Sequence, residues 1–246
     1  MDSITVRFLG CGDAVGSGGR FQTCLLVEGT TSRTLIDCGA SSLVAMKRVG
    51  VEPRDISLVL VSHLHGDHFG GLPFLVLDGQ FSKRDRPLII AGPPGIETRT
   101  REAMEVFFPG SSSTKQRFQV TFVELQARRS MAFGPVRVTP FTVVHASGAP
   151  PYALRVELES RTIAYSGDTE WTDTLVDVSE KADLFICEAY FFDKRIPFHL
   201  DYQSLWTRRA LLTCRRIVLT HMSAEMMSRP PLAGVEYAYD GLALDL

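Results

Sequence analysis

The chain has 246 residues, a formal net charge of −2 and a hydrophobic content of 45%. This length is sufficient for one large domain, and no break in composition divides the chain, so we expect a single domain over residues 1–246. The weakly acidic balance gives no support for a general nucleic-acid binder, because such proteins present a basic surface.

The cysteines and the distribution of apolar residues bear on location. The five cysteines are odd in number and widely spaced, which fits a reducing compartment better than a disulfide framework. The first residues show no basic segment followed by a long apolar one, and no apolar run is long enough to span a bilayer. We therefore expect a cytoplasmic location and no membrane partner.

The first part of the chain is typical of strands separated by glycine-rich turns. Residues 4–9 alternate apolar and polar, and residues 10–19 form a glycine-rich loop. A dinucleotide-binding loop would lead into a helix, but here the pattern of residues 20–28 predicts a second strand. We expect a glycine-rich hairpin at the mouth of a pocket. Residues 32–39 predict a third strand, and residues 40–49 a helix that buries Leu43, Val44 and Met46.

A cluster of histidines follows the apolar strand predicted for residues 56–61. His63, His65, Asp67 and His68 lie within six residues, directly where this strand ends. Imidazoles and a carboxylate at such a spacing indicate a metal site. In a tight loop, His63 and His65 can point the same way while Asp67 and His68 turn toward a neighbouring point, which suits two metal ions better than one. The alternative is a polar loop with solvated histidines.

Further ligand-type side chains follow other predicted strands. His145 comes after residues 136–144, Asp168 after the hairpin 152–158 and 161–165, and His221 after residues 216–220. The remaining pattern predicts strands at 88–91, 119–124, 131–133 and 182–187, and helices at 69–78, 96–108 and from Asp201 onward, where Leu205, Leu211 and Leu212 face inward. We assign 119–124, 131–133 and 136–144 to the second half of the fold.

The HxHxDH motif at residues 63–68 resembles that of the metallo-β-lactamase-fold hydrolases. The chain around it is most similar to the ribonuclease Z and small phosphodiesterase branch, nearly from end to end. This resemblance implies an α/β fold, a four-layered αββα sandwich in which two mixed sheets are flanked by helices. In the family, the residue matching Asp37 lies behind the metal site; a turn-forming aspartate is the alternative.

The resemblance also implies the ligands of a dinuclear centre. One metal would be held by His63, His65 and His145, and the other by Asp67, His68 and His221, with Asp168 bridging the two. Imidazole and carboxylate ligands without cysteine suit Zn²⁺, and also Mn²⁺ or Fe²⁺. Such a pair holds a bridging hydroxide and stabilises both oxygens of a displacement, which suits phosphodiester hydrolysis.

In ribonuclease Z-like enzymes a glutamate assists a histidine that protonates the leaving oxygen. Glu188 and His199 occupy these positions, so with Asp67 they are the catalytic residues that the resemblance implies. The family's His-Ser-Thr is here His199-Leu200-Asp201, and a histidine that only contacts substrate is the alternative.

Ribonuclease Z proteins carry an arm that grips transfer RNA, and there is no room for it between His145 and Asp168. We therefore expect a dinuclear metal-dependent phosphodiesterase for a small phosphodiester or cyclic nucleotide, with transfer RNA an unfavoured partner. The arginines at positions 20, 155, 208 and 209 are candidates for phosphate contacts.

The alternatives are a lactonase or carboxylic-ester hydrolase, a transfer RNA 3′-processing endoribonuclease, and a non-hydrolytic metal-binding protein. An oxygen-reducing diiron site is disfavoured, because that branch has a carboxylate where His65 stands. Homodimerisation is an expectation from the family.

Overall fold

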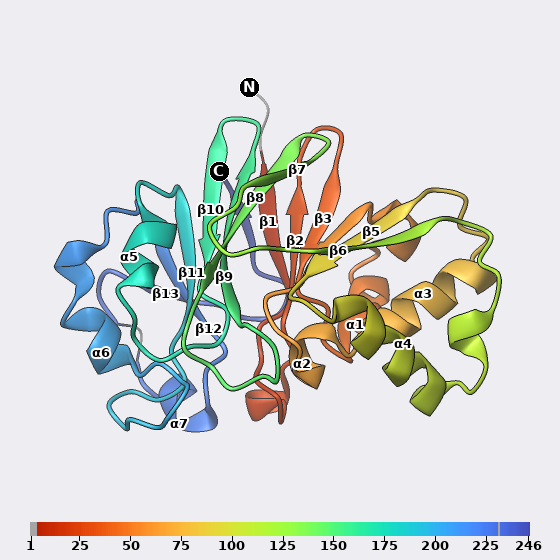
Figure 1. Cartoon of the computed structure of the whole chain (residues 1–246). Helices are drawn as coiled ribbons and strands as arrows, with labels where there is room; N and C mark the ends of the chain where they lie inside the picture. Colours follow the sequence, from red (N-terminus) through yellow and green to blue (C-terminus); the bar gives the residue numbers. More distant parts are fainter. Residues whose placement is uncertain (1–3, 231) are drawn as a thin grey trace.

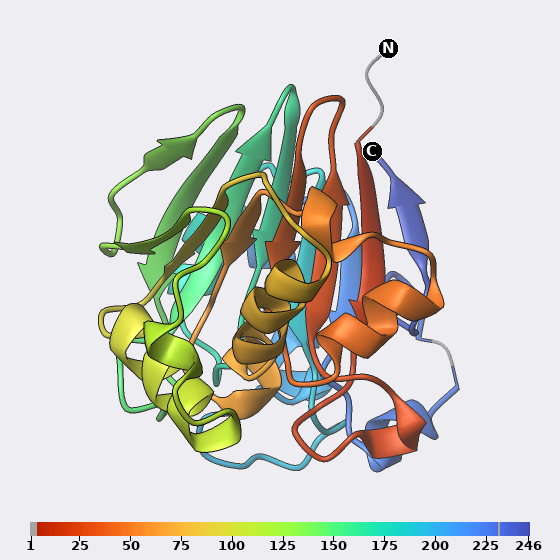
Figure 2. The same cartoon turned by 90° about the vertical axis from the view of Figure 1, so that its right-hand side faces the viewer.

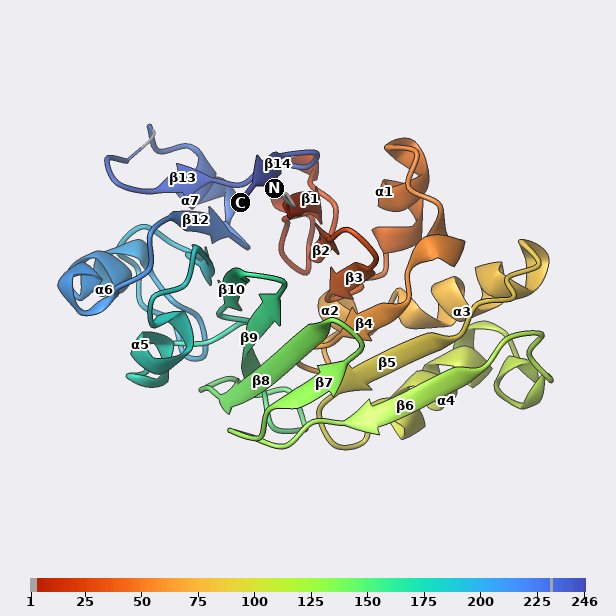
Figure 3. The same cartoon turned by 90° about the horizontal axis from the view of Figure 1, so that it is seen from above.

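The computed structural model describes residues 4–230 and 232–246, in which two seven-stranded sheets pack face to face between two layers of helices. The view from above separates the four layers, with α1, α3 and α4 outside one sheet and α5 and α6 outside the other (Figure 3). The predicted αββα sandwich of two mixed sheets is confirmed.

The first sheet combines an antiparallel part with a parallel part. Its order is β14 (Ala243–Asp245), β1 (Thr5–Gly10), β2 (Cys24–Glu28), β3 (Arg33–Ile36), β4 (Leu58–Leu60), β5 (Leu88–Gly92) and β6 (Val120–Glu124). The pairs from β3 to β6 are parallel, and the others are antiparallel. Residues 119–124 thus close the first sheet, and their assignment to the second half was wrong. The chain returns parallel to β5 through a crossover helix, as parallel pairing requires.

The second sheet has the same mixed character. Its order is β13 (Glu236–Tyr237), β12 (Ile217–Thr220), β11 (Leu184–Glu188), β10 (Arg161–Tyr165), β9 (Tyr152–Leu158), β8 (Val136–Thr142) and β7 (Met131–Phe133). The strands from β10 to β13 are parallel, while β7 to β10 form an antiparallel meander. Parallel strands direct their carboxyl ends to one edge, which is where the predicted ligands follow them.

Helices cover the outer faces of both sheets. The first sheet carries α1 (Ser42–Arg48), α3 (Leu72–Phe81) and α4 (Ile96–Phe107), which Figure 2 shows in front of the strands. The second carries α5 (Thr174–Ser179) and α6 (Tyr202–Trp206), while the short α2 (Gly66–Phe69) and α7 (Ala224–Met227) lie at the lower edge in Figure 1. Within the described chain, none of these helices has the length and apolar character needed to cross a membrane.

The main core lies between the two sheets. Alternate residues of each strand point into it, such as Val6 and Phe8 of β1 and Leu154 and Val156 of β9, all fully buried. Burying each such side chain contributes roughly 1.5–3 kcal/mol, which holds the sheets together with strand ends aligned. Two further clusters pack the helices against the outer faces.

Several helix details differ from the sequence predictions. Val44 is 61% exposed, because Ala45 and Met46 are the residues of α1 that face the sheet. Leu211 is 52% exposed, since α6 ends at Trp206 and a 3-10 turn follows. The helix predicted for residues 69–78 divides into α2 and α3. The pattern also did not predict α5, β13 or β14.

The break between α2 and α3 occurs at Gly70 and Gly71, where backbones come unusually close. A Cβ on Gly71 would lie 2.3 Å from the carbonyl oxygen of Gly39, and the Gly71 N–H donates to the Cys38 carbonyl at 2.8 Å. Only glycine fits such an approach. The contact ties the histidine motif to the turn that follows β3.

Candidate metal centre

The predicted ligand residues gather at one edge of the sandwich, because each follows a strand that ends there. His63 follows β4, His145 follows β8, Asp168 follows β10 and His221 follows β12. In Figure 1 this is the lower edge, where α2 and α7 also lie. The two sheets therefore contribute side chains to one shared place.

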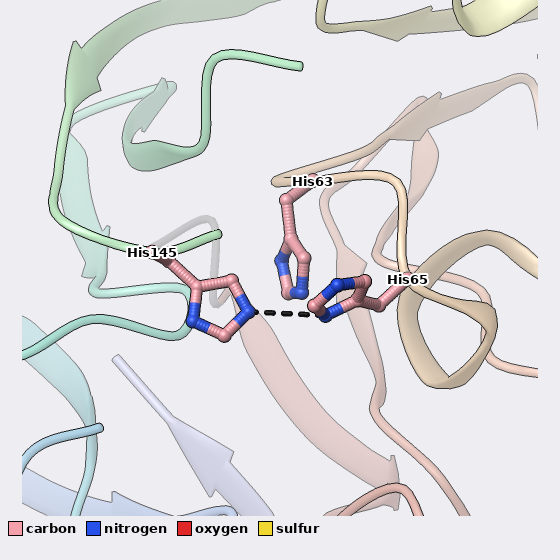
Figure 4. Close-up of side chains that lie close together, drawn as sticks. All are labelled: His63, His65 and His145. Atoms are coloured by element: carbon pink, nitrogen blue, oxygen red, sulfur yellow. Dashed lines mark hydrogen bonds between the residues drawn. The ribbon is translucent and has the colours of Figure 1, made fainter. Parts of the chain in front are cut away.

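The first group consists of His63, His65 and His145, whose ring nitrogens lie within 4.8 Å of one another. Figure 4 shows the three rings facing a common point, with Nε2 of His145 3.0 Å from Nδ1 of His65. The Nδ1–H of His145 donates to the carbonyl oxygen of Phe198 at 2.9 Å, so Nε2 is left to face the group. Burial, followed by the charge of His68, holds the pKa of His63 well below its usual value. A neutral imidazole is the form that binds a metal ion.

The second group consists of Asp67, His68, His221 and Asp168, all of them buried. Nε2 of His68 lies 3.3 Å from both Asp67 Oδ2 and Asp168 Oδ1. Nε2 of His221 lies 3.2 Å from Asp67 Oδ2 and 3.3 Å from Asp168 Oδ2. Two carboxylates and two imidazoles that converge in this way match the ligand chemistry of a divalent cation.

Asp168 lies between the two groups. Its Oδ2 is 3.8 Å from Nε2 of His63 and 3.9 Å from Nε2 of His145, while its two oxygens also face the second group. A carboxylate in this position can contact two cations at once. The turn that carries it includes Gly167, whose φ of +58° favours glycine.

Asp37 supports the site from behind. Its Oδ1 accepts the Ser62 N–H at 2.7 Å, and its Oδ2 lies 2.7 Å from Nδ1 of His68 and accepts the Tyr165 hydroxyl at 3.0 Å. Such a partner fixes which ring nitrogen of His68 points toward the metal position. Asp37 and His221 both adopt a positive φ, and backbone strain of this kind concentrates at functional sites.

The donor atoms of the two groups include several that are buried without a hydrogen-bond partner in the part of the chain that the structure describes. They are Nε2 of His63, Nε2 of His68 and Oδ1 of Asp168. A buried polar group without a partner costs about 1–3 kcal/mol, and more when it is charged. Binding cations would satisfy these atoms, so the residues present fit a two-metal centre.

Glu188 and His199 form a pair beside the second group. Glu188 is fully buried, and its Oε1 makes a short contact with Nδ1 of His199. Its Oε2 accepts the N–H groups of Thr169 at 2.9 Å and Leu200 at 3.3 Å. Because Nδ1 is engaged, Nε2 is the ring nitrogen of His199 that can exchange a proton with a substrate.

The pKa of His199 results from opposing effects. Burial lowers it, but the hydrogen bond and the negative charge of Glu188 outweigh burial and raise the pKa above its usual value. His199 therefore stays protonated to higher pH than a free histidine. That is the form a general acid needs.

The cavities of the molecule differ in their chemistry. One of about 200 Å³ has His199 in its wall, next to the second ligand group. A larger one, of about 600 Å³, lies at the opposite ends of β3 and β4 and is lined by residues such as Arg33 and Arg54. None of the predicted site residues lines the larger cavity, so the chemistry points to the smaller one.

The structure brings all nine predicted site residues together at this edge. Of the four candidate phosphate contacts, Arg208 lines the smaller cavity, whereas Arg155 and Arg209 donate to backbone carbonyls outside it. Arg20 lines neither of the two cavities. Sequence reasoning missed the carbonyl of Phe198 and the hydroxyl of Tyr165 as supports. Tyr165 ends β10, the strand that leads to Asp168, and this position could have indicated it, whereas nothing in the sequence marks the carbonyl of Phe198.

Comparison with known proteins places the chain in a family. The family described as Anti-Pycsar protein Apyc1 matches residues 4–233. Ribonuclease Z of Bacillus licheniformis is 26% identical over 293 aligned positions, covering 96% of this chain and 93% of the relative. The human short-form tRNase Z (ELAC1) superposes with a TM-score of 0.80 at 25% identity, over 98% of both chains. The metallo-β-lactamase-fold protein YhfI from Bacillus subtilis gives 0.81 at 20% identity, over 100% of both chains.

These similarities confirm the metallo-β-lactamase fold and the resemblance to ribonuclease Z-like proteins. Together with the two ligand groups they show a metal-dependent hydrolase of the phosphodiesterase kind. The chain belongs to the family of the Anti-Pycsar protein Apyc1, whose members degrade cyclic nucleotides.

Proposed function

We propose that this protein hydrolyses small cyclic nucleotides at a dinuclear metal centre. The observation that carries the proposal is the pairing of two ligand groups through Asp168, with the His199–Glu188 pair beside them. Membership of a family that degrades cyclic nucleotides supports the substrate class.

In this proposal His63, His65 and His145 would hold one cation, and Asp67, His68 and His221 would hold the other, with Asp168 between the two groups. Two divalent cations at such a site activate water and neutralise the charge that develops on the phosphoryl oxygens. Asp37 orients His68, and the Phe198 carbonyl orients His145. We further propose Zn²⁺ as the metal, because the ligands are imidazoles and carboxylates without thiolate, a set that Mn²⁺ and Fe²⁺ also accept.

The chain's own residues supply the proton for the leaving group. In a cyclic nucleotide, attack of water forms one P–O bond and breaks another, and the departing oxygen belongs to the ribose. His199 donates its Nε2 proton to that oxygen, which leaves as a hydroxyl of a linear nucleotide. Glu188 holds the ring by Nδ1 and stabilises the charged imidazole before the transfer.

The shape of the chain favours a small substrate over folded RNA. Between His145 and Asp168 the chain forms only β9, β10 and their connections, all within the described residues. The alignment with ribonuclease Z of B. licheniformis spans 293 positions, more than the 246 residues here, so that relative carries segments that this chain lacks. The net charge of −2 also disfavours a long polyanion.

Location and assembly remain proposals. All five cysteines are buried and free, which supports a reducing compartment such as the cytoplasm. Homodimerisation is proposed from the resemblance to ribonuclease Z-like proteins alone.

A substrate panel tests the proposed function. We expect the metal-loaded protein to hydrolyse 3′,5′-cyclic nucleotides and bis-p-nitrophenyl phosphate, and to leave lactones and precursor transfer RNA intact. Turnover of lactones without any phosphodiester would favour the carboxylic-ester alternative. Cleavage of precursor transfer RNA with no action on cyclic nucleotides would favour a ribonuclease Z activity.

A further inference from the structure

The position of the general acid indicates where the rest of a cyclic nucleotide lies. A general acid must be within hydrogen-bond reach of the leaving oxygen, which in this substrate is part of the ribose. The ribose and the base attached to it therefore lie on the His199 side of the metal centre. The cavity of about 200 Å³ opens on that side, with His199 in its wall.

This cavity, here called the Trp171 cavity, is lined by His199 together with Glu170, Trp171, Arg195, Ser204 and Arg208. Pockets that enclose a whole drug-sized ligand have volumes of roughly 300–1,000 Å³. The Trp171 cavity is smaller, so it accommodates one fragment of a nucleotide. Its wall combines an aromatic face with charged groups, which is the chemistry that recognises a nucleobase.

The aromatic wall is held in place by its neighbours. The guanidinium of Arg208 lies over the Trp171 ring, 5.2 Å from the ring centroid. Arg208 Nη1 donates to the Ser204 carbonyl at 3.1 Å, and Trp171 Nε1 donates to Asp173 Oδ1 at 3.3 Å. Both side chains are therefore positioned before a ligand arrives, which lowers the entropy cost of binding.

Glu170 adds a hydrogen-bond acceptor to the same wall. Its N–H donates to the Val144 carbonyl at 3.2 Å, which fixes the backbone next to His145. Its carboxylate makes no hydrogen bond or ion pair with any other described residue. An ionised carboxylate only accepts hydrogen bonds, so it suits the amino group of a base such as adenine or cytosine.

We propose that the Trp171 cavity binds the nucleobase of the substrate, with the stacked pair of Arg208 and Trp171 as the surface on which the base stacks and Glu170 as the acceptor for an amino group of the base. This inference rests on the proposed function. Trp171 and Glu170 would then determine which base the enzyme accepts, because they contact the base of the substrate.

The test compares a cyclic nucleotide with the same cyclic ribose phosphate that carries no base. The substrates are 3′,5′-cyclic AMP and the base-free methyl riboside 3,5-cyclic phosphate, and the variant is Trp171→Ala. We expect kcat/KM for cyclic AMP to fall about 5-fold to 150-fold, the equivalent of the ~1–3 kcal/mol that base stacking on an aromatic ring contributes. The base-free substrate should change less than twofold. Trp206→Ala is the matched control, because Trp206 is the other tryptophan and lies outside the cavity.

Glu170→Gln tests the acceptor separately. Cyclic AMP and cyclic IMP differ on one edge of the base, where the amino donor at C6 is replaced by a carbonyl acceptor and the acceptor N1 becomes an N–H donor. We expect wild type to prefer cyclic AMP and Glu170→Gln to lose that preference, because an amide can donate to the carbonyl. An unchanged ratio overturns the role of Glu170.

A binding measurement keeps the proposal testable without turnover. In Trp206→Phe, Trp171 is the remaining tryptophan, so AMP should quench its fluorescence, whereas ribose 5-phosphate should not. Equal losses for both substrates in Trp171→Ala, or no quenching by AMP, refute the base assignment. A wild type that hydrolyses neither cyclic phosphate instead refutes the proposed function, and one that hydrolyses both equally well refutes only this inference.

Discussion

Replacing His199 with alanine should separate proton donation from metal chemistry. Nδ1 of His199 is held by the buried Glu188, so Nε2 is the atom that donates to the leaving oxygen. Loss of a general acid lowers a rate by about 10²-fold to 10⁴-fold, which corresponds to roughly 2.7–5.5 kcal/mol of transition-state stabilisation. We expect a decrease of this size in kcat for 3′,5′-cyclic AMP, whose ribose oxygen needs a proton.

The substrate bis-p-nitrophenyl phosphate provides the internal control for His199→Ala. Its leaving group departs as a stable phenolate without a proton, so we expect its rate to fall less than tenfold. Metal content measured by elemental analysis should stay at the wild-type value. Equal losses for both substrates, or a loss of bound metal, would show that His199 serves the metal centre and would refute its role as an acid.

The pH dependence of the same reaction tests Glu188. Burial lowers the pKa of His199, and the hydrogen bond and charge of Glu188 raise it by more. Glu188→Gln removes the charge, so the pKa of His199 should fall and the alkaline limb of the kcat profile for cyclic AMP should move to lower pH. A limb that does not move, or moves to higher pH, contradicts the pairing.

Three further predictions concern metal binding and folding. Asp168→Asn should reduce the metal bound per chain by at least half in elemental analysis, because one carboxylate faces both groups; full occupancy would contradict a bridging position. Asp37→Asn should weaken metal affinity by about 10-fold to 100-fold in a chelator competition, because it orients His68; unchanged affinity would contradict that role. Gly71→Ala should lower the urea midpoint, since its Cβ would lie 2.3 Å from a carbonyl oxygen, whereas Gly66→Ala, with no atom within 4 Å, should not; equal shifts would contradict the steric argument.

Most strands of this fold could be predicted from the sequence, because their burial requires apolar residues that alternate or run together along the strand. Residues 152–158 and 161–165 were predicted with the observed bounds of β9 and β10, since alternation and a two-residue turn leave little freedom. The αββα layering came from the resemblance carried by the histidine motif. The sheet to which a strand belongs was harder to predict. Nothing in the sequence of β6 distinguishes pairing with β5 from pairing with β7, because contacts between residues far apart in the chain decide which sheet the strand joins.

The short elements were the least predictable. α5 and β14 have six and three residues, and their stability comes from packing against strands far away in sequence. Val44 was predicted to be buried because it is apolar, although the direction of α1 against the sheet places Ala45 inside instead. Local pattern does not specify such a rotation.

The candidate site was predictable where residue type and strand end coincide. His63, Asp168 and His221 each follow an apolar strand, and such ends converge in a sandwich with parallel strands. The carbonyl of Phe198 was not predictable, because any residue has a carbonyl and only the fold brings this one to His145. A role for Trp171 was likewise not predictable, because only the fold shows that its side chain lines a cavity beside His199.

The most direct test of a metal-dependent cyclic nucleotide phosphodiesterase is a phosphorus NMR time course with 3′,5′-cyclic AMP and the metal-loaded protein. We expect the cyclic diester resonance to be replaced by that of a linear monoester, and addition of EDTA to stop the conversion. A cyclic diester resonance that persists while the protein retains its full metal content would contradict the central claim.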